Sequence, residues 1–324
     1  MSKKKCNYVA VGGQALMEGI MMKGPKGTAM SLRLPDGTIE TTMKDFTSIR
    51  NKFKIFNIPI IRGIVSFVES MIFGYKLLME SAEKTSIDFE EESESKLDKW
   101  ITDHFGPKMM AVIGGISAVL GVGLAFLLFM WMPSFVFDLV NDHLADGSLD
   151  ALRAIFEGVI RVIIFIAYMA LVARMKEIHR VYMYHGAEHK TIFCYEQGLE
   201  LTPENAAKMS RLHPRCGTSF LVFVMIISII IFSLVPNFAD TYGRILGTLA
   251  GLGVRILLLP VVAGLSYEII RWAGRSTSPV VALLSKPGMW MQKITTREPD
   301  ESQLEVAIAA MKAVLTDNKE DDKW

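Results

Sequence analysis

Apolar residues gather in long runs in the second two-thirds of the chain, and a helix that spans a bilayer needs about 20 such residues. Four runs meet this requirement: 109–132, 155–173, 219–235 and 245–270. The first is uncharged and ends before Pro133, whereas the second contains Glu157 and Arg161 one helical turn apart, where they can pair. The pattern predicts a mainly α-helical, multi-pass membrane protein with four spans.

Charges in the connecting segments orient these spans, because Lys and Arg near span ends stay on the cytoplasmic side. The connection after the first span is acidic and has no basic residue before Arg153. The connection after the second span is rich in basic residues: Arg174, Lys176, Arg180, Lys190, Lys208, Arg211 and Arg215. The sequence therefore predicts a cell-membrane protein with both termini in the cytoplasm and with 174–218 as a cytosolic segment.

The region before the first span predicts a small cytosolic part with β-structure over 1–57. Residues 8–11, 29–34 and 39–42 have strand character, and Pro35-Asp36-Gly37 is typical of a turn. We therefore expect a hairpin built from the last two of these segments.

A helix is predicted next, over 58–82, with Pro59 near its start. Apolar residues cover most of its circumference and basic residues flank both of its sides, so we expect it to lie along the bilayer surface. Residues 83–108 form an acidic connector. The tail, 271–324, is predicted to be cytosolic, with an amphipathic helix over 303–314 as a docking element.

Composition agrees with a membrane protein, because 51% of the residues are hydrophobic and the mean hydropathy is +0.31. The 35 Lys and Arg nearly balance the 34 Asp and Glu, which gives no reason to expect a nucleic-acid partner. The three cysteines, Cys6, Cys194 and Cys216, are too few and too odd in number for a disulfide framework. They fit a reducing compartment.

The strongest candidate for chemistry is the run His185-Gly186-Ala187-Glu188-His189. The four-residue spacing places both imidazoles on one helical face, where they can bind a metal ion, and Glu188 lies on the adjoining face. HxxEH is the pattern of the reversed zinc peptidases, in which the Glu is a general base. The alternative interpretation is a juxtamembrane helix whose polar residues face water or lipid headgroups.

Two further features can complete a metal site. His213 and Cys216 offer an imidazole and a thiolate from one turn at the inner edge of the third span, although an inert, half-buried thiol is the alternative. Glu268, near the end of the fourth span, needs a cation or an ion pair with Arg271, one turn on. A downstream Glu supplies the third ligand in reversed zinc peptidases, and Glu268 has a comparable place.

These candidates converge on the cytoplasmic face by topology alone. Apolar and site residues recur at helical spacing over 175–197, which predicts that the second span continues unbroken into the cytosol and carries the HxxEH motif. Cys194 and Glu196 are reserve ligands. We expect a divalent metal, zinc or alternatively iron.

The N-terminal run 11–25 has four glycines around the polar residues Gln14 and Glu18. Glycine permits close backbone approach to a ligand or to another segment. Gln14 and Glu18 either point at the metal site or pack a turn, and packing is the role that we expect.

Several long motifs together resemble the YqhQ-like bacterial membrane proteins. They are GGQALMEGIMMKGP near the N-terminus, PIIRG at 59–63, HGAEHKTIFCYE at 185–196, HPRCGTSF at 213–220 and SYEIIR at 266–271. That family is grouped as a domain of unknown function and labelled as predicted metal-dependent enzymes. The resemblance covers nearly the whole chain apart from the acidic connector and the C-terminal end. It implies a multi-pass membrane protein with a metal-dependent role.

The leading hypothesis is a metal-dependent hydrolase of peptidase or amidase type that acts on a protein or peptide. His185 and His189 bind the metal, Glu188 is the base, and His213, Cys216 or Glu268 completes the ligand set. A non-catalytic membrane assembly or regulatory factor, with a closed structural metal site or a polar cluster, is the alternative. A metal or proton transporter is a weaker one, because the spans contain few ionisable residues.

Overall fold

The computed structural model describes residues 9–85, 115–117, 119–144, 149, 152–214, 216–236, 238–274, 279–316 and 322. Cys6, Arg215 and most of the predicted acidic connector lie outside these residues. The chain forms two compact units, one of Met1–Thr85 with Met169–Trp324 and one of Ser86–Tyr168. The first unit therefore joins the N-terminal region to the chain that follows the second predicted span.

The first unit contains a four-stranded antiparallel sheet in the order β1-β2-β3-β4. Its strands are β1 (Gly12–Leu16), β2 (Gly19–Gly24), β3 (Gly27–Arg33) and β4 (Ile39–Lys44). The predicted hairpin is confirmed, since Arg33 pairs with Ile39 across the expected turn. The sequence did not predict the β1-β2 hairpin, whose two-residue turn places Glu18 at a φ of +47°.

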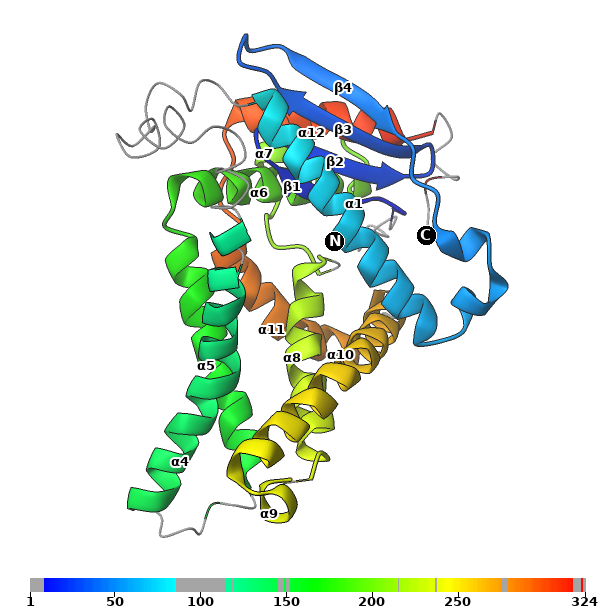
Figure 1. The fold of residues 1–324 in the computed structure, drawn as a ribbon. Helices are drawn as coiled ribbons and strands as arrows, with labels where there is room; N and C mark the ends of the chain where they lie inside the picture. Colours follow the sequence, from blue (N-terminus) through cyan, green and yellow to red (C-terminus); the bar gives the residue numbers. More distant parts are fainter. Residues whose placement is uncertain are drawn as a thin grey trace, which may run out of the picture. The chain divides into compact units, whose positions relative to one another are not determined.

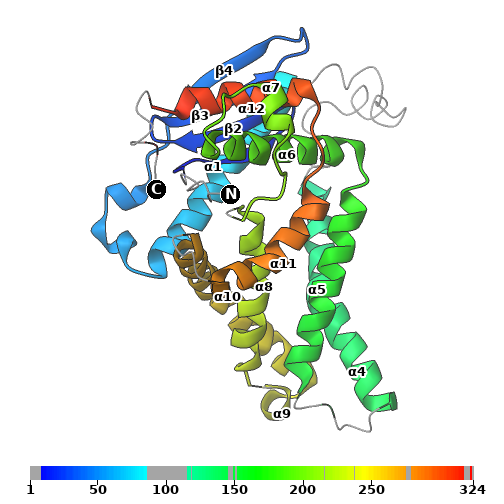
Figure 2. The ribbon, with the colours of Figure 1, turned by 180° about the vertical axis from the view of Figure 1, so that it is seen from behind.

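The sheet is covered by helices on both faces because its apolar residues alternate along the strands. Ile20, Met22 and Ala29 pack with α6 (Lys176–Glu196) and α12 (Glu301–Val314) in the larger core. The opposite face packs on α1 (Ile61–Thr85), in a core of Leu16, Met30, Leu32 and Leu77. Figure 1 shows α1 in front of the sheet, and Figure 2 shows α6 and α12 on the other face.

Helix α12 contributes more to the core than the docking element that the sequence predicted. It begins at a capping box in which Asp300 accepts from the Gln303 amide and Gln303 accepts from the Asp300 amide. Its Val306, Ala307 and Met311 are fully buried against the sheet and α6. The helix joins the C-terminal part of the chain to the N-terminal sheet, with the short α7 (Pro203–Ala207) beside it.

Helix α1 is the predicted helix 58–82, displaced by three residues along the chain. It begins after Ile60, whose φ of +71° is unusual for a β-branched residue and prevents the helix from starting at Pro59. Two 3₁₀ helices, η1 (Ile49–Asn51) and η2 (Lys54–Asn57), connect β4 to α1. The placement of α1 along a bilayer surface stays a prediction.

The first unit also contains apolar helices beyond the sheet. α8 (Thr218–Ser233) packs against α10 (Arg244–Gly274) and α11 (Pro279–Thr295), and the short α9 (Ala239–Tyr242) precedes α10. The apolar part of α8, the third predicted span, is only Phe220–Ser233, whereas Leu249–Trp272 of α10 is long and apolar enough to cross a bilayer. The sequence did not predict α11 as a helix.

The second unit holds the helix Gly115–His143 and most of α5 (Arg153–Val172), both long and apolar enough to cross a bilayer. The first helix passes Pro133, beyond the predicted span, through the π-helical turn η3 (Leu127–Trp131) and α4 (Met132–Leu144). Such a turn adjusts the hydrogen-bond register next to a proline. The predicted pair is confirmed, with Glu157 and Arg161 2.8 Å apart.

The prediction of one unbroken helix through the second span and the HxxEH motif is wrong. α5 ends at Val172, and α6 begins at Lys176 after an extended Met175 (φ −68°, ψ 136°). The change of composition explains the break, because α5 is apolar whereas α6 is polar on average and packs on the sheet.

Candidate metal centre

Helix α6 presents the HxxEH motif on a face that is buried in the first unit. His189 and Glu188 are 2% and 5% exposed, and His185 is partly exposed. The imidazoles of His185 and His189 are neighbours with ring centroids 4.5 Å apart, as expected for residues one turn apart on a helix. The spacing read from the sequence therefore brings the two rings together.

Each histidine is oriented by a backbone carbonyl that accepts from its Nδ1. His185 Nδ1 lies 2.9 Å from Thr295 O, and His189 Nδ1 lies 2.6 Å from Arg211 O. Because a carbonyl oxygen only accepts, both Nδ1 atoms carry the proton, and the lone pair of each neutral ring is on Nε2. This fixed tautomer is the one that a metal-binding histidine needs.

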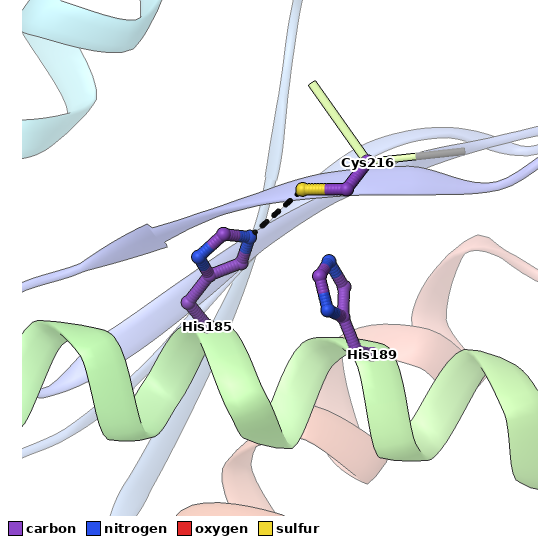
Figure 3. A group of neighbouring side chains, drawn as sticks. All are labelled: His185, His189 and Cys216. Carbon is purple, nitrogen blue, oxygen red and sulfur yellow. Dashed lines mark hydrogen bonds between the residues drawn. The ribbon is translucent and has the colours of Figure 1, made fainter. Parts of the chain in front are cut away.

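Cys216 completes a group of three potential metal ligands. It lies just before α8, and its Sγ is 3.2 Å from His185 Nε2. The ligand atoms of His185, His189 and Cys216 all lie within 4.8 Å of one another (Figure 3). His189 Nε2 is buried and has no hydrogen-bond partner among the described residues.

Glu188 faces the first strand of the sheet. The Gly13 backbone N–H donates to its carboxylate, and a Cβ on Gly13 would lie 3.0 Å from Glu188 Cδ. Burial raises the pKa of Glu188, while the electrostatic interaction with His185 and the Gly13 hydrogen bond oppose that rise. Glu188 Oε2 is buried and has no hydrogen-bond partner among the described residues. The glycine-rich run thus contacts the motif through its backbone.

His213 lies beside the three-residue group without belonging to it. Its ring centroid is 5.6 Å from that of His189, and its Nε2 is 3.5 Å from Oε2 of the buried Glu196. Gln292 holds the His213 backbone at both ends, accepting from its N–H at 2.7 Å and donating to its carbonyl at 2.8 Å. The structure therefore pairs His213 with Glu196, one of the two reserve ligands.

Glu268 lies in a different cluster, at the start of α1. Its carboxylate pairs with the guanidinium of Arg62 and accepts from the Ile60 backbone N–H. A carboxylate in this position stabilises the positive end of the helix dipole of α1. The sequence correctly required a partner for Glu268, but the partner is Arg62, and the group of potential ligands does not include Glu268.

The polar residues of the glycine-rich run have packing roles. Gln14 Nε2 donates to Gly74 O on α1 at 3.4 Å. Glu18 binds the guanidinium of Arg180 and accepts from the Tyr184 hydroxyl, so it ties the β1-β2 turn to α6. Burial raises the pKa of Tyr184. The expectation of packing is confirmed for both residues.

An ion network around Lys190 holds the backbone that orients His189. The buried ammonium donates to Ala207 O and to Met209 O, each at 2.8 Å, and lies 2.9 Å from Glu298. Glu298 also approaches Arg211, 3.4 Å away. The sequence placed Lys190 next to the motif but gave no signal of this role, because the acceptors are backbone carbonyls.

The fold and the site define a class: a mainly helical protein with a small sheet and a largely buried His, His, Cys group, in which three helices of the described residues are apolar and long enough to cross a bilayer. Residues 58–317 match the family described as "Protein of unknown function (DUF1385)", and the protein belongs to that family. The chain is 34% identical over 330 residues to "Uncharacterized protein YqhQ" of Bacillus subtilis (strain 168), covering 97% of this chain and 95% of that protein. No solved structure matches. The resemblance to YqhQ-like proteins is confirmed, and the activity stays a prediction.

Proposed function

We propose that the protein is a membrane-embedded, metal-dependent hydrolase of peptidase or amidase type, with its site at the cytoplasmic face. One observation carries the proposal more than any other. The imidazoles of the partly exposed His185 and the buried His189 have their Nδ1 atoms bound by backbone carbonyls, and their ligand atoms lie within 4.8 Å of the Cys216 thiol and of each other. Both rings are therefore held with the proton on Nδ1 and the lone pair on Nε2, which leaves Nε2 available to a metal ion.

The three residues suit zinc best, with iron as the alternative. Ligands of tetrahedral zinc lie about 3.5 Å apart, so a shift of about 1 Å would close this group around one ion. Two imidazoles and a thiolate form a borderline-soft donor set, which favours zinc over magnesium or calcium. Three protein ligands leave a fourth position for water or substrate, as in catalytic zinc sites.

In this proposal zinc supplies Lewis acidity, which polarises a scissile amide and lowers the pKa of a bound water. His185, His189 and Cys216 hold the site, and the Thr295 and Arg211 carbonyls keep the two rings in place. Glu188 is the general base. Its carboxylate would take a proton from the water that attacks the amide carbon and would give it to the nitrogen that leaves as the C–N bond breaks, a role that suits a carboxyl whose pKa burial has raised. His213 and Glu196 support the ring of His189 from the side.

The same proposal includes a four-span topology. α8 would be a short span between two longer ones, α1 would lie at the bilayer surface, and both termini would be cytoplasmic. The basic segment 174–218 would then be internal, as Lys and Arg near span ends require. Glu157 with Arg161 and Glu268 with Arg62 are paired, which weakens the transporter alternative.

A closed structural site in a non-catalytic membrane factor is the second candidate. The burial of His189 and Cys216, at 2% and 8% exposure, favours it, because a catalytic site must admit a substrate. A fourth protein ligand at the metal would decide for this alternative.

The first experiment measures metal per chain in the detergent-purified protein beside His185→Ala/His189→Ala. We expect about one zinc per chain in the wild type and none in the variant. His143→Ala, a histidine of α4 that lies in the second unit, is the control and should keep the metal. A wild-type protein without metal after reconstitution with zinc or iron would contradict the proposal.

The second experiment separates hydrolase from structural site. Purified protein is incubated with a quenched fluorescent peptide library, and cleavage is read by fluorescence and mass spectrometry. Glu188→Gln should keep the metal and lose cleavage, whereas Glu200→Gln, an exposed carboxylate just after α6, should retain both. Cleavage by Glu188→Gln at the wild-type rate contradicts the mechanism. A metal-loaded wild type that cleaves nothing favours the structural alternative.

A further inference from the structure

The segment 49–58, between β4 and α1, exposes large apolar side chains. Ile49, Phe53, Ile55 and Ile58 are 47%, 57%, 60% and 49% exposed. They follow one another along the connection formed by η1 and η2 between β4 and α1. A cluster of this kind marks a surface that is covered by a partner or by lipid.

The charges of the segment are all positive. Arg50, Lys52 and Lys54 interleave with the apolar residues, and no Asp or Glu occurs between positions 49 and 58. Glu69 of α1 accepts from Ser48 Oγ at 2.7 Å and from the Ile49 backbone N–H at 2.6 Å. Glu69 therefore ties the start of the segment to α1. Lys52 is exposed, and the Nε of the half-buried Arg50 donates to Ser48 Oγ at 3.3 Å.

The position of the segment indicates what covers it. α1 begins where it crosses α10, and Gly63 packs so tightly there that an added Cβ would lie 2.9 Å from Gly264 O. Gly264 belongs to the candidate span Leu249–Trp272, about 12 Å from its end at a rise of 1.5 Å per residue. The exposed Trp272 marks that end, as aromatic residues do at membrane interfaces. Residues 49–58 therefore lie just before the point where α1 crosses this candidate span.

We infer that residues 49–58 insert into the surface of an anionic bilayer, with their apolar side chains among the acyl chains and their basic residues at the phosphates. Basic and apolar residues in alternation are what such a surface requires. Together with the Arg62–Glu268 pair, this insertion would fix the angle of α1 at the membrane. The inference rests on the proposed assignment of Leu249–Trp272 as a span.

The test uses the full-length protein in nanodiscs of phosphatidylcholine and phosphatidylglycerol in equal parts. A diazirine amino acid replaces Ile55, Leu257 or Asp36 in turn, and photo-adducts are identified by mass spectrometry. Leu257, 77% exposed in the candidate span, reports on the span itself, and Asp36, exposed in the turn at the far end of β4, is the control. We expect phospholipid adducts at positions 55 and 257 and none at 36.

The outcomes separate the inference from the proposal on which it rests. Lipid adducts at 257 without any at 55 would overturn the inference alone, and so would adducts from 55 to protein. Absence of lipid adducts at both positions would overturn the span assignment as well. The share of phosphatidylglycerol among adducts should be at least about twofold higher at 55 than at 257. Arg50→Gln/Lys52→Gln should abolish that excess, and equal shares in the wild type would refute the recognition of anionic lipid.

Discussion

Gly186, inside the HxxEH motif, lets the connector between α11 and α12 cross α6. A Cβ added at this position would lie 2.0 Å from Arg297 O. Contacts between carbon and a carbonyl oxygen need about 3.3 Å, so Gly186→Ala must move the connector by more than about 1 Å. The same connector donates from the Arg297 amide to Tyr182 O at 2.8 Å, and it follows directly after Thr295, the last residue of α11, whose carbonyl orients His185.

The cost of Gly186→Ala follows from these contacts. Overpacking costs about 1–3 kcal/mol, and weakening the bond from the Arg297 amide adds about 1 kcal/mol. The helix propensity of alanine returns about 1 kcal/mol, so we expect a net loss of about 1–3 kcal/mol. The melting temperature should fall by about 3–8 °C. Because the Thr295 carbonyl moves with the connector, zinc affinity should fall by about 10- to 100-fold.

Thermal unfolding in detergent and competition with a zinc chelator measure both effects. Gly253→Ala is the matched control, since Gly253 is also inside a helix but an added Cβ meets nothing within 4 Å. That variant should be as stable as the wild type or more so. A Gly186→Ala protein with the wild-type melting temperature and zinc affinity would refute the packing argument and the role given to the Thr295 carbonyl.

Three other changes test the remaining contacts. Lys190→Met leaves the Ala207 and Met209 carbonyls without their donor. It should lower the free energy of unfolding by about 1–3 kcal/mol and the zinc affinity by at least about tenfold. Lys208→Met, at an exposed position, is the control and should change neither quantity. Glu268→Gln should lower the melting temperature, because it weakens the pair with Arg62, but should leave metal per chain unchanged in elemental analysis; loss of the metal would restore Glu268 as a ligand. Glu80→Gln tests pH dependence. A hydrogen bond from Lys44 holds the pKa of Glu80 below its ordinary value of 4.5, so the stabilisation, at most about 1 kcal/mol, is present above pH 4.5 and lost as the pH falls through the lowered pKa. Melting curves of wild type and variant should therefore differ at pH 7 and converge in acid, and a difference that persists in acid contradicts this origin.

Local patterns in the sequence predicted local features well. The turn at Pro35-Asp36-Gly37 predicted the β3-β4 hairpin, and the spacing of Glu157 and Arg161 predicted their ion pair. The helical spacing of His185 and His189 likewise predicted that they share a face. Each of these relations spans only a few residues, so backbone geometry alone determines it.

Relations over long distances along the chain could not be predicted in the same way. Glu268 required a partner, but nothing in the local sequence distinguished Arg271, one turn on, from Arg62, 206 positions away. The carbonyls of Thr295 and Arg211 give no sequence signal, because every residue has a carbonyl. The amphipathic pattern of α12 predicted an apolar face without saying that it covers the sheet and α6. Hydrophobic periodicity predicts that one face of a helix is buried, but it does not identify the element against which that face packs.

The core formed by the sheet, α6 and α12 has a consequence for biogenesis. β1 to β4 leave the ribosome early, whereas α12, which covers Met22 and Ala29, is made after the other described helices. Until residues 301–314 emerge, the apolar face of the sheet that α12 covers stays open. This core can therefore form only after synthesis has reached the end of α12. A chain terminated before α12 would leave Ile20, Met22 and Ala29 exposed, so chaperones and proteases would recognise truncated products.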